Sequence, residues 1–162
     1  MIEVEITEDI LDRARDVADS WDYNGSGNDL TSGGNLIGAI GALIVADSYG
    51  VDLVDHTEYN MIVHGIKIYV KTKQRRAGPP KGYYEASVNR SAMHVLKPDY
   101  FVFVSLRELD TAYIMGGIDA GDFISRSRFL AEGVVDPTNG YKNRKDCFNI
   151  AYEELHDLEV LV

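Results

Sequence analysis

Apolar and polar residues alternate most clearly in residues 59–73, where β-branched and aromatic side chains crowd both sides of His64-Gly65. Two such runs around a single glycine predict a β-hairpin with strands at Tyr59–Val63 and Ile66–Thr72. Successive side chains of a strand point to opposite faces, so the second strand should have one apolar face and one lysine-rich face. The apolar face holds Ile66, Ile68, Val70 and Thr72, and the other holds Lys67, Tyr69, Lys71 and Lys73. We expect the apolar face to pack in the core.

The same periodicities predict the remaining elements. Further strands are expected at Ile2–Ile6, Tyr100–Leu106, Thr111–Ile118 and Cys147–Tyr152, and helices after Thr7 to about Ser20, from Asn35 to Gly50, at Ala86–Leu96 and at Asp119–Leu130. Trp21–Gly34 is rich in Gly, Asn, Ser and Asp and predicts a surface loop. Alternating helices and strands of this kind favour an α/β (α+β) fold with a central mixed β-sheet flanked by helices.

Composition limits the class of protein further. A chain of 162 residues with 45% hydrophobic residues predicts a single domain, with a strand, helix and loop in residues 1–34 and the core in residues 35–162. Cys147 is the only cysteine, which fits a reducing compartment. The longest apolar run, Leu36–Ala46, is too short to cross a bilayer. We therefore expect a cytoplasmic protein without a membrane partner.

Charge is unevenly distributed along the chain. The net charge of −10 argues against indiscriminate binding to nucleic acid, which requires a positive surface. Six basic residues nevertheless fall in one short window, namely Lys67, Lys71, Lys73, Arg75, Arg76 and Lys81. This basic strip either binds DNA or only keeps an exposed connection soluble.

Several segments together resemble one nuclease superfamily. They are GAIGA at Gly38–Ala42, EYNMIV at Glu58–Val63, YVKTK at Tyr69–Lys73, PPKGYYEASV at Pro79–Val88 and PDYFVFV at Pro98–Val104. Their order is similar to that of the PD-(D/E)XK, restriction-endonuclease-like nucleases, in particular small phage-type members. The resemblance implies a restriction-endonuclease-like fold, a homodimer as in many members, and a location in the host cytoplasm if the chain is phage-encoded.

The chain departs from the superfamily pattern at the positions that bind metal. The resemblance aligns Ala42, Asn60 and Tyr69 with the carboxylates that hold Mg²⁺, and only the lysine, Lys71, is kept. An alanine, an amide and a phenol are poor substitutes for carboxylates around a hard cation. We therefore expect no bound metal and a degenerate active site. Gly38 and Gly41 belong to the GAIGA segment of this resemblance, but they also have a purely structural interpretation. Small residues at these positions let the helix pack closely against the sheet.

Three functions stay open on these residues. The leading hypothesis is a catalytically inactive nuclease-fold protein that binds nucleic acid through the basic strip, or binds a protein partner. The second is an active Mg²⁺-dependent endonuclease with Glu58 and Asp55 as relocated ligands. The third is an acidic protein-interaction or virion-associated protein with no role in nucleic-acid binding. Tyr69 either stacks on a base or fills the vacated cleft with its ring.

Overall fold

A mixed five-stranded sheet forms the centre of the fold in the computed structural model, which describes residues 1–23, 32–55 and 57–158. Its strands lie in the order β1 (Ile2–Glu5), β6 (Thr111–Asp119), β5 (Tyr100–Arg107), β3 (Ile66–Arg75) and β2 (Met61–Val63). Strands β3 and β5 pair in parallel, and the other neighbours pair antiparallel. The predicted α/β class, a mixed sheet flanked by helices, is confirmed.

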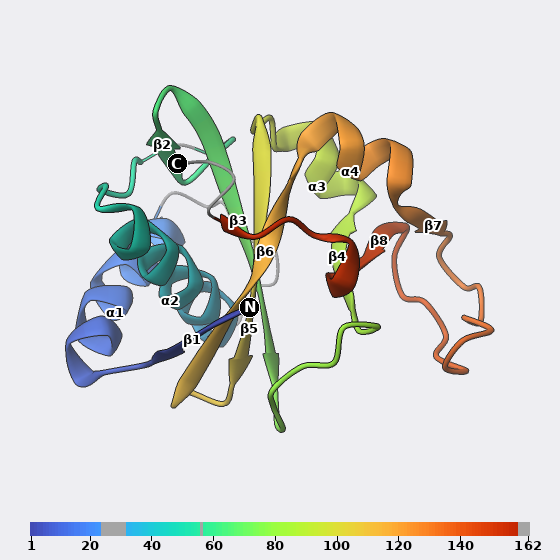
Figure 1. Ribbon diagram of the computed structural model, residues 1–162, viewed down its shortest axis with the longest axis horizontal. Helices are drawn as coiled ribbons and strands as arrows, with labels where there is room; N and C mark the ends of the chain where they lie inside the picture. The colour runs from blue at the N-terminus through green and yellow to red at the C-terminus, as the bar shows by residue number, and fades with distance from the viewer. Residues whose placement is uncertain (24–31, 56, 159–162) are drawn as a thin grey trace.

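Helices α1 (Glu8–Tyr23) and α2 (Ser32–Tyr49) lie on one side of this sheet (Figure 1). The side chains of Ile68 and Val102 on that face are fully buried in a cluster shared with both helices. Helix α2 lies close to β3 at Gly41, where an added Cβ would lie 1.9 Å from Thr72 Oγ1. The packing interpretation is therefore confirmed for Gly41, which no larger residue can replace without a shift.

A second layer covers the opposite side of the sheet (Figure 1). It contains a three-stranded antiparallel sheet in the order β4 (Glu85–Asn89), β8 (Cys147–Ala151) and β7 (Arg128–Leu130), together with α3 (Arg90–Val95), α4 (Ala120–Arg126) and the 3-10 helix η1 (Tyr152–Glu154). Phe123 of α4 lies with its ring centroid 5.2 Å from that of Phe101 and 5.8 Å from that of Phe103. An aromatic cluster thus joins the two layers.

The predicted hairpin is confirmed, with β2 and β3 paired antiparallel around His64-Gly65. Both turn residues have positive φ, 49° at His64 and 82° at Gly65, as a tight two-residue hairpin turn requires. The structure also confirms a strand within Ile2–Ile6 at the edge of the sheet. Strand β5 is buried on both faces, as its continuous apolar sequence predicts.

Three predicted elements are wrong or incomplete. Residues predicted as a helix over Ala86–Leu96 instead form β4 and then the short α3, because Ala86 and Val88 alternate inward and pair with β8. The predicted helix Asp119–Leu130 ends at Arg126, and β7 follows it. The helix predicted from Asn35 to Gly50 begins earlier, at Ser32, and ends at Tyr49.

The predicted loop Trp21–Gly34 is only partly within the described residues. Its first residues extend α1 to Tyr23 and its last belong to α2, whereas residues 24–31 lie outside the described part of the chain. Among the residues that are described, no helix has both the length and the apolar character needed to cross a membrane.

Candidate functional site

Tyr69 lies on the lysine-bearing face of β3 and packs into the aromatic cluster. Its ring meets Phe101 edge-to-face, with 6.3 Å between the centroids. Burial raises the pKa of its hydroxyl, because a phenolate would lose its hydration there. A phenol that stays neutral contributes little to binding a hard cation. The Tyr69 ring therefore lies between the sheet and the layer that covers it.

The lysines of this face are spread along the strand. Lys67 lies at the hairpin end, with its ammonium 5.4 Å from the centroid of the Tyr59 ring. Lys71 is partly buried beside Tyr69, and its strand neighbour in β5 is Phe103. Lys73 lies about 20 Å from Lys67, given the rise per residue of a strand. The pKa of Lys73 is lowered, mainly because its ammonium is partly buried and loses hydration. The positive charge of Arg75 lowers it further.

Asn60 has a structural role at the edge of β3. Its side chain is 8% exposed, and its Oδ1 accepts a hydrogen bond from the Val70 amide at 2.7 Å. The backbone N–H of Asn60 donates to the Ile68 carbonyl at 2.8 Å, which extends the pairing of β2 with β3 by one residue. The neutral side-chain amide of Asn60 satisfies the buried Val70 N–H, whereas a carboxylate there would place a charge in the interior. The local geometry thus accounts for an asparagine here.

Ala42 lies on the other side of the sheet from Tyr69 and Lys71. It belongs to the cluster between the helices and the sheet and is 1% exposed. Its neighbour Gly41 contacts Thr72, and Lys71 precedes Thr72 in a strand whose side chains alternate between faces. The structure therefore does not bring together the positions that the nuclease resemblance assigns to one active site.

The proposed relocated ligands, Glu58 and Asp55, lie in the segment before β2. The carbonyl of Glu58 accepts a hydrogen bond from the Lys97 amide at 3.2 Å, so this residue lies beside the segment that leads into β5. Asp55 is exposed before it. Within residues 1–23, 32–55 and 57–158, no three His, Cys, Asp or Glu side chains lie close enough to hold a metal ion.

The exposed part of the basic strip lies at the carboxyl end of β3. Lys73, Arg76 and Lys81 are exposed there, and the Lys81 ammonium lies 5.8 Å from the centroid of the Tyr83 ring, which is 62% exposed. Arg75 differs from them because its guanidinium stacks on the Tyr84 ring at 4.9 Å. The strip thus divides into a packed residue, Arg75, and an exposed group of cations beside an aromatic ring.

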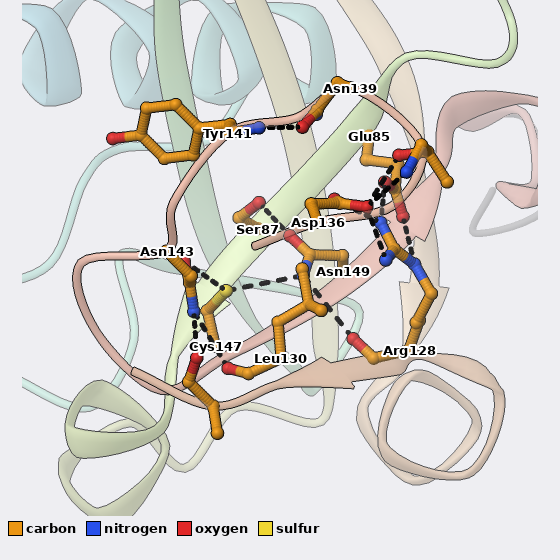
Figure 2. A network of polar contacts seen from close by, with 12 residues as sticks. Glu85, Ser87, Arg128, Leu130, Asp136, Asn139, Tyr141, Asn143, Cys147 and Asn149 are labelled. Carbon is orange, nitrogen blue, oxygen red and sulfur yellow. Dashed lines mark hydrogen bonds and ion pairs between the residues drawn. The ribbon is translucent and has the colours of Figure 1, made fainter. Parts of the chain in front are cut away.

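Sequence reasoning missed a polar network on the outer face of the second sheet (Figure 2). Arg128 joins Glu85 and Asp136, with its Nη2 2.9 Å from Asp136 Oδ2. Asp136 is only 4% exposed, and its pKa is well below the usual range, because Arg128 pairs with it and Thr138 donates two hydrogen bonds to it. The turn DPTNG is visible in the sequence, but nothing there marks Arg128 as its partner.

The network continues from Ser87 to Asn149, whose amide donates to Cys147 Sγ at 3.3 Å. Cys147 in turn lies 3.6 Å from Asn143 Oδ1. These contacts join β4 and β8 to the segment between β7 and β8, residues 131–146, which folds back over the sheet (Figure 2). Cys147 is buried below this segment and is 7% exposed.

Comparisons of the chain with protein-family models, with curated proteins and with solved structures found no match in any of the three. The resemblance to PD-(D/E)XK nucleases therefore remains an expectation from the sequence.

Proposed function

We propose that this protein binds nucleic acid without cleaving it, through the cations exposed at the carboxyl end of β3. One observation carries the proposal: Arg76 and Lys81 are exposed just after β3, and the Lys81 ammonium lies over the exposed ring of Tyr83. Cations that meet phosphates next to an aromatic ring that stacks on a base are the usual elements of sites for single-stranded nucleic acid. The restriction-endonuclease-like ancestry is part of the proposal.

Cleavage is not part of the proposed function, because the residues for it lie apart. Ala42 is buried on the helix side of the sheet, Asn60 is committed to Val70, and Tyr69 packs against Phe101. A metal-dependent nuclease positions its cations and its lysine around a single phosphate. Incubation with single- and double-stranded DNA and RNA in Mg²⁺ or Mn²⁺ should leave the substrates intact, and cleavage that Lys71→Ala abolishes would overturn this part.

Binding is tested with charge reversals at the exposed cations. We expect Arg76→Glu with Lys81→Glu to weaken binding of a labelled single strand, measured by fluorescence anisotropy. Each phosphate contact that is lost should reduce the dependence of log K on log salt by about 0.7. The matched control is Arg15→Glu with Lys97→Glu, two exposed cations outside the strip.

Binding that is equally strong in the strip variant and the control would contradict the proposal. A wild-type protein that binds no nucleic acid at low salt would refute it outright. That result would favour the protein-interaction hypothesis, since the overall charge of −10 then dominates the surface.

A further inference from the structure

Residues 131–146, between β7 and β8, form an arm with the backbone pairing of a hairpin. Val135 and Lys142 make an antiparallel bridge, and the Asp136 amide donates to the Tyr141 carbonyl at 2.8 Å. On the other side of the bridge, the Asn143 amide donates to the Val134 carbonyl at 2.8 Å. The arm is therefore an ordered hairpin with its turn at residues 136–140.

Side chains attach this arm to the second sheet at both ends. Near the turn, the buried Asp136 carboxylate pairs with Arg128. At the base, Asn143 Nδ2 donates to the carbonyls of Leu130 and Ala131 at 2.9 and 3.2 Å. A surface held in this way loses little conformational freedom when it binds a partner.

The outward surface of the arm is basic and aromatic. Tyr141 is 53% exposed and is followed in sequence by three exposed cations, Lys142, Arg144 and Lys145. None of the three forms a salt bridge with any described residue. An open recess of about 540 Å³ lies among Tyr141, Lys142 and Arg144, and Glu132 is the one acidic residue that lines it.

Residues 142–145 thus hold three cations that form no salt bridge with the described residues, in a chain of net charge −10. Like charges this close repel one another, and an anionic partner would relieve that repulsion. Arg144 can contact a phosphate with two parallel hydrogen bonds, and the lysines act as point charges. An exposed tyrosine beside them offers a flat surface on which an unpaired base can stack.

We propose that the 131–146 arm is a second contact surface for single-stranded nucleic acid, with Tyr141 stacked on a base and Lys142, Arg144 and Lys145 bound to phosphates. The inference rests on the proposed function, because it assigns a further surface for the same kind of ligand. A single strand fits better than a duplex, since the bases of a duplex are already stacked on one another.

The segments that carry the two basic surfaces enter the second sheet at opposite ends of its strands. The exposed cations at the end of β3 lead into β4, and the arm leads into β8, its antiparallel neighbour (Figure 1). Cys147, at the start of β8, contacts Asn143 of the arm. One strand of nucleic acid that follows the second sheet can thus contact both surfaces.

The test measures anisotropy of labelled oligothymidylate and oligouridylate of about 20 nucleotides. We expect Lys142→Glu with Lys145→Glu to weaken binding about 10-fold or more at low salt and to flatten its salt dependence. Tyr141→Ala should weaken binding about 5- to 150-fold, whereas Tyr141→Phe, which keeps the ring, should bind as the wild type does. All substituted side chains are exposed, so thermal unfolding should be unchanged.

The outcomes separate this inference from the proposed function. Arm variants that bind like the wild type, while the β3 variants bind weakly, would refute the arm and leave the function in place. Weak binding by the arm variants alone would support the arm and refute the role of the β3 cations. A wild-type protein that binds neither oligonucleotide would refute both, and comparison of the two oligonucleotides tells DNA from RNA.

Discussion

Two glycines of helix α2 should respond in opposite ways to the same substitution. A Cβ on Gly41 would lie 1.9 Å from Thr72 Oγ1 and 2.9 Å from Thr72 Cβ, whereas a Cβ on Gly38 would meet nothing nearer than a Trp21 ring carbon at 3.5 Å. Distances below 3.0 Å require the neighbour to move, and 3.5 Å is ordinary contact. We therefore predict that Gly41→Ala destabilises the protein and that Gly38→Ala does not.

The magnitudes follow from two opposing effects. Alanine favours a helix interior over glycine by about 1 kcal/mol, and Gly38→Ala should gain up to that amount. In Gly41→Ala the same gain is offset by overpacking, which costs about 1–3 kcal/mol and sometimes more. The clash is with a β-branched side chain held in a central strand, which cannot easily rotate away. Because the helix-propensity gain is common to both variants, we expect Gly41→Ala to be less stable than Gly38→Ala by the overpacking cost, roughly 1–3 kcal/mol.

Urea unfolding followed by circular dichroism measures both free energies. The double variant Gly41→Ala with Thr72→Ala should recover part of the loss, because it removes the hydroxyl and methyl groups that clash and leaves only the 2.9 Å contact between Cβ atoms. Equal stability of the Gly41→Ala and Gly38→Ala proteins, or no recovery in the double variant, would refute the close approach of α2 to β3.

Three further predictions concern buried polar groups. Asn60→Asp should lower the free energy of unfolding by on the order of 2 kcal/mol at neutral pH and by much less near pH 3. Burial raises the pKa of a carboxyl group, so the penalty appears only as the introduced side chain ionises. Urea unfolding at both pH values checks this. Tyr69, whose folded pKa is raised, stabilises the fold below the unfolded value of about 10 and loses that contribution above it. Between about pH 9 and pH 11, urea unfolding should therefore show a smaller loss of stability for Tyr69→Phe than for the wild type. Part of the loss should remain in the variant, because Tyr49, whose pKa is raised to about 12, contributes in the same way. Asp136, whose folded pKa is lowered, stabilises the fold above about pH 3.9 and loses this as the pH falls. Asp136→Asn should show a shallower acid decline and faster protease cleavage within the arm at neutral pH.

Local pattern was sufficient to predict much of the central sheet. The β2–β3 hairpin follows from the β-branched residues around His64-Gly65, and the burial of β5 on both faces follows from its continuous apolar run. The second sheet was not predictable in the same way. Residues 85–89 are short and weakly patterned, and they become a strand only because β8, some sixty residues later, pairs with them.

The candidate site, like the second sheet, was only partly predictable from local sequence. The basic cluster near the end of β3 is contiguous in the sequence, so composition alone was enough to find it. The role of Arg75, stacked on Tyr84, and the partner of Asp136 both depend on contacts between distant segments. The arm cations at residues 142–145 were visible in the sequence as well, but nothing marked them as exposed and unpaired until the hairpin placed them on the surface.

The alternation of β3 also limits what its lysine face can be. Thr72 contacts the helix that carries Ala42, so Lys71, one residue earlier, must point to the other face. A carboxylate at position 42 would thus be separated from Lys71 by the sheet itself, and restoring acidic residues at the three degenerate positions would not assemble one metal site. Arg76 and Lys81 are not affected by this separation, because they follow β3 and are exposed. A metal site built from positions 42, 60 and 69 would require α2 and β3 to pack differently, whereas binding through these exposed cations would not.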